Sequence, residues 1–250
     1  MSYTLTLLIL FAASAFAGAQ NALAGGGSFV TFPALLLAGL DPRAANITST
    51  VALFPGQITS GWFNRRLATR TPSLSLWALT GISLAGGMVG AVLLLTTPAA
   101  FFARLVPWLV LFATTVFAWG SFFRKPPEPG QAIGVVPAAI SQFLIAIYGG
   151  YFGGGIGFLM LAALTAAGLA VKPANATKNV LAGVMNGAAV LIFAFSPDVH
   201  WLPATVTCVG ALLGGLVGAW ALRRAPDKPL KAVVVAIGVL LTIGLFLRQG

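Results

Sequence analysis

The sequence predicts an all-α, polytopic integral membrane protein, and three observations support this fold class. First, 58% of the 250 residues are hydrophobic and 7% are charged, whereas a soluble domain carries about 25% charged residues. Second, the apolar residues gather in ten segments separated by short connectors. Third, these segments are apolar on all sides, whereas the strands of a membrane barrel alternate apolar and polar positions. We therefore expect helices throughout.

Two of the predicted segments are shorter than a membrane crossing, which needs about 20 apolar residues. Each of the two begins at a glycine triplet, Gly25 to Gly27 or Gly153 to Gly155. We interpret them as parts of glycine-broken helices, because exposed backbone at membrane depth is tolerated where protein or a water-filled cavity surrounds it. The predicted segments are residues 3–23, 28–40 (short), 44–64, 73–97, 102–123, 132–151, 156–171 (short), 175–196, 200–222 and 229–248.

The two halves of the chain resemble each other at a nearly constant offset of 128–129 residues. The matched stretches are Ala-Asn-Ile-Thr at 45–48 with Ala-Asn-Ala-Thr at 174–177, Gln57 with Asn186, GGMVGA at 86–91 with GGLVGA at 214–219, and Pro98 with Pro226. A constant offset over so long a stretch is hard to attribute to compositional bias. We predict a tandem duplication.

The predicted repeats are residues 1–125 and residues 130–250, which together form one transmembrane domain. Each repeat holds five helical segments. Because five is an odd number, the two copies cross the membrane in opposite directions, which gives an inverted-topology repeat.

The distribution of positive charge predicts the orientation. Fourteen Lys and Arg against four Asp and Glu give a net charge of +10. In a soluble protein this excess would suggest a nucleic-acid partner, but here the basic residues lie mostly at segment ends, where they set topology and contact lipid headgroups. With segment 44–64 ending in the cytoplasm, eleven basic residues are cytoplasmic and three, Arg43, Arg104 and Arg248, are outside. Both termini then face outward, and we expect no nucleic-acid partner.

The titratable residues argue against an enzyme. Cys208 and His200 are the only cysteine and histidine, so we expect neither a disulfide within the chain nor a metal cluster, and no cofactor. The four acids, Asp41, Glu128, Asp198 and Asp227, all fall in predicted connectors, which argues against cation transport and carboxylate catalysis. Asp198 and His200 form either a pH-sensitive pair or part of a solvated connector.

The glycine breaks offer backbone donors to an anion. The N–H groups at the start of a helix are free and carry partial positive charge, so we assign Gly27, Ser28 and Gly155 to a binding site. The alternative is that glycines permit close helix crossing, as small residues do in membranes. We prefer this alternative for the glycines of the two GG-x-V-G-A stretches.

Polar side chains at matched positions complete the predicted substrate site. Asparagine, threonine, serine and glutamine donors suit the oxygens of a small oxyanion, although interhelical hydrogen bonding would explain them as well. The candidates are Asn46, Thr48, Ser49, Gln57, Asn175, Thr177, Asn179 and Asn186. Lys178 lies among them with no acid nearby in sequence. It either supplies countercharge at depth, which is costly without a function, or snorkels to the headgroups.

The paired pattern resembles the sulfite exporter TauE/SafE family, also called the toluene sulfonate uptake permeases. The resemblance covers essentially the whole chain and rests on GGG-SF and G-L-D-P in the first half and on GGG-x-G and A-N-A-T-K-N in the second. It implies transport of a small anion such as sulfite or a sulfonate, with export driven by an ion gradient. The first half has Thr-Ser-Thr at 48–50 where the second has Thr-Lys-Asn at 177–179, so a single lysine makes the site asymmetric.

We therefore expect a secondary transporter in a bacterial inner membrane, working by alternating access at a midplane site between the repeats. Its partners would be a small anionic substrate, membrane lipids and a coupling proton. An anion channel, or a transporter of another small anion, is the alternative function.

Overall fold

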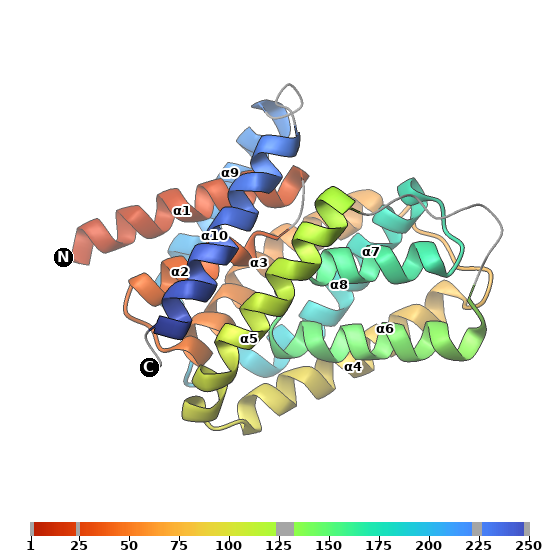
Figure 1. Cartoon of the computed structure of the whole chain (residues 1–250), viewed down its shortest axis with the longest axis horizontal. Helices are drawn as coiled ribbons and strands as arrows, with labels where there is room; N and C mark the ends of the chain where they lie inside the picture. The colour runs from red at the N-terminus through yellow and green to blue at the C-terminus, as the bar shows by residue number, and fades with distance from the viewer. Residues whose placement is uncertain (1–2, 24–25, 124–132, 222–226, 248–250) are drawn as a thin grey trace.

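The structure is a computed structural model that describes residues 3–23, 26–123, 133–221 and 227–247. The described residues form ten α-helices and a π-helical turn that continues α5 (Figure 1). The helices are α1 (Tyr3–Leu23), α2 (Ser28–Leu37), α3 (Pro42–Asn64), α4 (Leu76–Thr96), α5 (Ala99–Ala118), the π-helical turn (Trp119–Phe123), α6 (Val135–Tyr151), α7 (Ile156–Ala166), α8 (Val171–Phe193), α9 (Trp201–Ala221) and α10 (Asp227–Leu247). The predicted all-α fold of a polytopic membrane protein is confirmed.

Length and composition suit the helices to a membrane. Four of them, α1, α4, α5 and α8, are long and apolar enough to cross one, and the other apolar helices that the structure describes are shorter over their described residues. Large apolar side chains point outward along these helices, including Trp77, Leu216 and Leu240, which are 86%, 73% and 69% exposed. Such side chains are costly in water but favourable against lipid tails.

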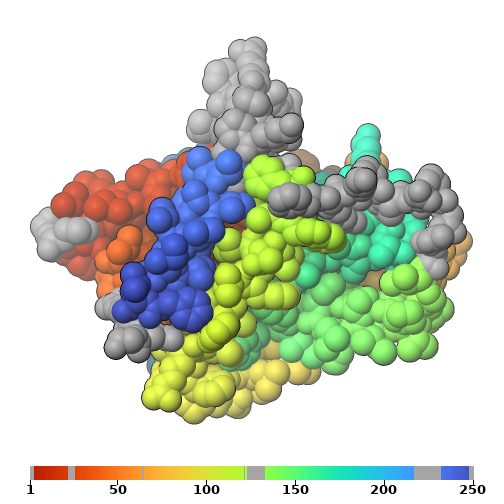
Figure 2. Space-filling model, in the orientation of Figure 1, coloured from red at the N-terminus to blue at the C-terminus, as the bar shows by residue number. Residues whose placement is uncertain are grey.

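The helices pack in pairs that have counterparts in the two halves of the chain. α1 packs on α9 as α6 packs on α4, α3 packs on α9 as α8 packs on α4, and α2 contacts α1 and α3 as α7 contacts α6 and α8. The remaining large contacts join α3 to α8 and α5 to α10. Figure 2 shows α5 and α10 side by side over one face of the molecule. Exchange of the two halves leaves this set of contacts unchanged.

Glycines allow two of these helix pairs to approach closely. A Cβ atom on Gly90 of α4 would collide with the backbone of α6 at Ile147 and Tyr151, and one on Gly214 of α9 would collide with the backbone of α1 at Ala15. Such contacts require a residue without a side chain. The helix-crossing interpretation is therefore correct for these two glycines.

The predicted helix boundaries needed correction around the short helices. α2 ends at Leu37 and not at residue 40, and α7 ends at Ala166 and not at residue 171, because each is followed by a glycine with positive φ, Gly39 (+95°) or Gly168 (+94°). This left-handed conformation terminates a helix and favours glycine. α8 then begins at Val171, four residues earlier than predicted.

Candidate substrate site at the helix breaks

The second helix break separates α6 from α7. Gly153 and Gly155 have φ angles of +80° and +73°, and Gly155 is the N-cap residue of α7 without a side-chain cap. The carbonyl group of Gly155 accepts hydrogen bonds from the N–H groups of Phe158 and Leu159. Within the described residues, the N–H groups of Ile156 and Gly157 have no acceptor. The start of α7 thus presents free donors at the positive end of a helix dipole.

Lys178 extends from α8 to this helix start. A Cβ atom placed on Gly157 would lie 3.9 Å from both Cδ and Nζ of Lys178, so the ammonium group sits beside the first turn of α7. Lys178 is half-buried, and no carboxylate in the described part of the chain forms an ion pair with it. The ammonium group of Lys178 and the positive end of the α7 dipole would repel each other, yet they lie side by side. An anion bound between them would relieve that repulsion.

The first helix break is closed by hydrogen bonds within the protein. The Gly27 N–H donates to Oδ1 of Asn21 at 3.3 Å, and the Gly27 carbonyl accepts from the Thr31 hydroxyl at 3.3 Å. Thr31 also shares a hydrogen bond of 2.7 Å with the hydroxyl of Ser49, which is 3% exposed. The predicted donors Gly27 and Ser49 thus already have partners, and the break differs in this respect from the second one.

A small cavity, with room for about one water molecule, lies between the two breaks. Ser28 follows the first glycine triplet and Gly154 belongs to the second, and both line this cavity together with Asn46. The Asn46 side chain is 4% exposed and donates from Nδ2 to the carbonyl of Tyr151, 3.0 Å away, at the end of α6. The rest of the lining is apolar: Phe29, Phe32, Val110, Phe152 and Leu241. The structure therefore brings Ser28, Asn46 and the second triplet together, with few polar groups.

Gln57 and Asn186 meet where α3 crosses α8. Nδ2 of Asn186 donates to Oε1 of Gln57 at 2.7 Å, and Asn186 is 3% exposed. The two residues occupy matched positions of the two halves. Their hydrogen bond joins the halves in the C-terminal half of each helix.

Thr48 and Thr177 occupy matched positions, and the hydroxyl group of each forms hydrogen bonds with the backbone of a connector. Thr177 near the start of α8 donates to the carbonyl of Thr69 at 3.1 Å and accepts from the N–H of Thr69 at 3.0 Å. Thr48 near the start of α3 donates to the carbonyl of Asp198 at 3.4 Å and accepts from the N–H of His200 at 3.2 Å. Both threonines are fully buried, so their hydroxyl groups have little left to offer a ligand.

Two of the predicted asparagines, Asn175 and Asn179, are not part of the lining of this cavity. Asn175 is exposed in the first turn of α8, whereas its matched residue Asn46 is buried beside the cavity. Asn179 is half-buried, and its carbonyl approaches Gly61, where a Cβ atom would lie 3.2 Å from it. The expectation that both matched asparagines face one pocket is therefore wrong for Asn175, because α8 begins earlier and places it near the helix end.

Sequence reasoning missed two groups of residues. Phe152 and Phe32, whose rings lie 5.7 Å apart edge to face, bring the two breaks into contact. The aromatic residue directly before the second glycine triplet was the available signal. Arg43 was assigned only to topology, although its opposite charge and predicted location on the same side as Asp198 could have suggested an ion pair.

Comparison with known proteins identifies the family of the chain and the class of its relatives. The profile of the family described as "Sulfite exporter TauE/SafE" matches residues 10–245. The chain is 27% identical to a "Probable membrane transporter protein" of Haemophilus influenzae, an alignment that covers 98% of this chain and 96% of the relative. It is 28% identical to the "Probable membrane transporter protein YfcA" of Escherichia coli K12 (95% and 88% covered) and 30% identical to the "Probable membrane transporter protein ORF9" of a Sinorhizobium species (96% and 92% covered). The predicted class, a membrane transporter and not an enzyme, is confirmed by these relationships. Because the family profile matches the chain almost from end to end, the protein belongs to the sulfite exporter TauE/SafE family.

Proposed function

We propose that this protein is a secondary-active exporter of a small sulfur-containing oxyanion, sulfite or an organosulfonate. The observation that carries the proposal is the ammonium group of Lys178 beside the open N-terminus of α7, with no carboxylate paired to it in the described part of the chain. A site with two positive features and no acid favours an anion over a cation. The family description supports sulfite as the first substrate to test.

In the proposed site the oxyanion lies at the start of α7. The N–H groups of Ile156 and Gly157 donate to its oxygens, Gly155 permits close approach, and Lys178 supplies countercharge. Asn179, one residue further along α8, and the Asn186–Gln57 pair provide further amide donors on the same helix crossing. Ser28, at the first break, and Asn46, on α3, line the small cavity next to Gly154 of the second triplet. Thr48 and Thr177 act as positioning residues, since connectors occupy their hydroxyl groups.

We further propose that the two halves, residues 1–125 and 130–250, are inverted repeats that rock against each other. Three matched features support this proposal. They are the paired helix contacts, the Gln57–Asn186 hydrogen bond between equivalent positions, and the equivalent hydrogen bonds of Thr48 and Thr177 to the backbones of connectors. Equivalent halves facing opposite ways give two conformations of similar energy, which alternating access requires. The charge distribution supports location in the bacterial inner membrane with both termini outside. A proton gradient is the proposed driving force.

The test is flux in proteoliposomes. Proteoliposomes that contain the wild-type protein and are loaded with sulfite should show saturable transport and counterflow. The transport rate of Lys178→Gln should be lower by about tenfold or more, because a charge-assisted hydrogen bond contributes about 1.5–3 kcal/mol. Lys172→Gln is the matched control, since Lys172 is a basic residue of the same helix but is exposed in its first turn.

Two outcomes would contradict the proposal in different ways. Absence of sulfite and sulfonate flux with folded wild-type protein would refute the substrate. Normal flux with Lys178→Gln would refute the site. Electrical conductance without saturation or counterflow would instead identify an anion channel.

A further inference from the structure

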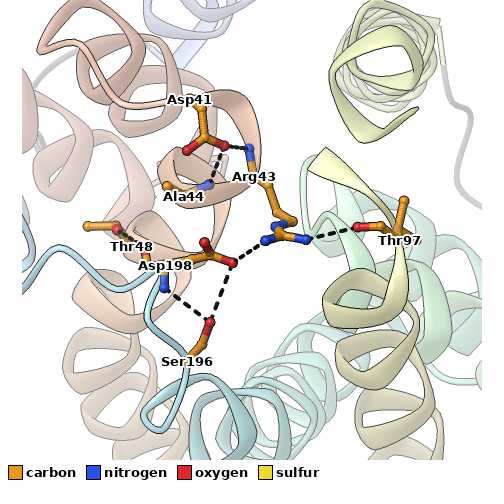
Figure 3. A network of polar contacts seen from close by, with 7 residues as sticks. All are labelled: Asp41, Arg43, Ala44, Thr48, Thr97, Ser196 and Asp198. Carbon is orange, nitrogen blue, oxygen red and sulfur yellow. Dashed lines mark hydrogen bonds and ion pairs between the residues drawn. The ribbon is translucent and has the colours of Figure 1, made fainter. Parts of the chain in front are cut away.

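An ion pair joins the two halves of the protein at the end where α3 begins. Nη2 of Arg43 lies 2.9 Å from Oδ2 of Asp198, and Nη1 of Arg43 donates to the carbonyl of Thr97 at 3.0 Å (Figure 3). Arg43 belongs to α3, Thr97 ends α4, and Asp198 lies in the connector between α8 and α9. One guanidinium group thus bridges three elements.

Asp198 is held in place by hydrogen bonds with Ser196 of its own connector, one of them to the carboxylate, and with Thr48 of α3. The backbone N–H of Asp198 donates to the hydroxyl of Ser196 at 3.2 Å, and its carbonyl accepts from Thr48 of α3. Figure 3 shows Asp198 directed toward Arg43 between α3 and the end of α4. The side chains of Arg43 and Asp198 are 21% and 19% exposed, so the pair is partly shielded from water. Shielding makes such a pair stronger than a fully exposed one.

The position of Arg43 is unfavourable without this partner. It is the second residue of α3, where the helix dipole repels a positive charge. Asp41, the N-cap residue, accepts from the backbone N–H groups of Arg43 and Ala44. The partial charge at the helix start is therefore balanced by Asp41, and the Arg43 side chain is directed away toward Asp198 and Thr97.

The opposite end of the protein has no equivalent ion pair within the described residues. The position matched to Arg43 is Lys172, which is exposed, and the position matched to Asp198 is Thr69, which is neutral. There the matched connector is held to α8 by the two hydrogen bonds between Thr69 and Thr177. The two ends thus share their hydrogen bonds but differ in charge pairing.

We propose that Arg43 and Asp198 form the gate that closes one entrance to the substrate site, on the side that the charge distribution predicts to be outside. This inference rests on the proposed alternating access. Opening this end separates the α8–α9 connector from the start of α3 and the end of α4. The ion pair between Arg43 and Asp198 must break in that step. Because the other end lacks the pair, the gate biases the resting protein toward the conformation closed at the Arg43 end.

The test is thiol accessibility beneath the gate. Ile47 lies one helical turn below Arg43 on α3 and is fully buried, so Ile47→Cys in a Cys208→Ser background reports opening through its rate of labelling by a membrane-impermeant maleimide. Arg43→Gln or Asp198→Asn should each raise that rate about fivefold, the factor that corresponds to ~1 kcal/mol. The reversed pair, Arg43→Asp with Asp198→Arg, should restore slow labelling. Lys172→Gln is the control and should leave the rate unchanged.

A second measurement uses transport as its readout and tests the gate independently of how well the labelling variants fold. Arg43→Cys with Asp198→Cys, joined by a short bifunctional thiol reagent, should abolish transport until the link is cleaved. Unchanged labelling in the single variants, or full transport with the link in place, would overturn the gate. Labelling needs no substrate, so it still reports the gate if sulfite proves to be the wrong anion.

Discussion

The side-chain amide of Asn186 donates to the side-chain oxygen of Gln57, 2.7 Å away, and thereby joins α8 to α3 at positions that are equivalent in the two halves of the chain. Two different amides fill the equivalent positions, and only one donates to the other. The pair is therefore asymmetric, although it lies between two helices, α3 and α8, that are counterparts of each other. If the halves rock as proposed, this hydrogen bond would have to be strained, kept as a pivot or exchanged during the movement.

This pair should stabilise the folded protein measurably. In Gln57→Leu the buried Asn186 donor loses its partner, so we expect the free energy of unfolding to fall by about 1–2 kcal/mol. A double-mutant cycle with Asn186→Leu should give a coupling energy of about 0.6–1.7 kcal/mol, the range found for hydrogen bonds between membrane helices. Unfolding in detergent, followed by tryptophan fluorescence, measures it. A coupling energy near zero would mean that water or lipid satisfies both amides.

Close packing of α4 on α6 gives a second prediction. In Gly90→Ala the new Cβ atom meets the backbone at Ile147 and Tyr151, which cannot move aside as a side chain can. We expect a loss of about 1–3 kcal/mol in the free energy of unfolding. Gly81→Ala on the same helix is the control, because its Cβ atom would meet nothing within 4 Å. An equal effect of the two substitutions would contradict the helix-crossing explanation.

The helices were largely predictable because hydropathy and glycine determine them locally. The prediction for residues 3–23 reproduced α1, and both helix breaks lie at the glycine triplets. The start of α8 was missed because Lys172-Pro173 was interpreted as a connector. Proline is tolerated in the first turn of a helix, where its missing N–H has no acceptor to lose, and Pro173 occupies this position.

The partners of the polar side chains were much less predictable. Sequence spacing placed Thr48 and Thr177 among the donors, but which donors remain free depends on connectors far away in the sequence. Thr177, for instance, is occupied by Thr69. The same limit applies to Arg43, whose ion pair with Asp198 depends on how α3 meets the α8–α9 connector. Matched positions indicated which residues correspond, and packing decided what each one contacts.

The hydrogen bonds between Thr177 and the backbone of Thr69 give a third prediction. Thr177→Val removes the hydroxyl group but keeps the shape, so the N–H and carbonyl of Thr69 lose a partner in a buried setting. We expect the free energy of unfolding to fall by about 1–3 kcal/mol. Thr177→Ser should recover most of that loss. Thr59→Val is the control, since the exposed Thr59 hydroxyl only donates back to Pro55 within α3. A loss that serine fails to recover would assign the effect to packing.

The last prediction separates stability from transport at the proposed site. A methyl group on Gly157 would lie 3.9 Å from Cδ and Nζ of Lys178, an ordinary contact distance, so Gly157→Ala should fit without displacing any neighbour. Alanine favours a helix over glycine by about 1 kcal/mol, and the unfolding midpoint should therefore stay the same or rise.

Transport should change in the opposite direction. The methyl group would occupy the space between the Lys178 ammonium group and the first turn of α7, where the oxyanion is proposed to bind. We expect a higher KM for sulfite in proteoliposomes, while Gly244→Ala on α10, with open space around it, should leave KM unchanged. A stable Gly157→Ala protein with wild-type KM would show that the substrate does not approach this turn. A coincident loss of stability and transport would point to misfolding, so the two measurements belong on the same preparation.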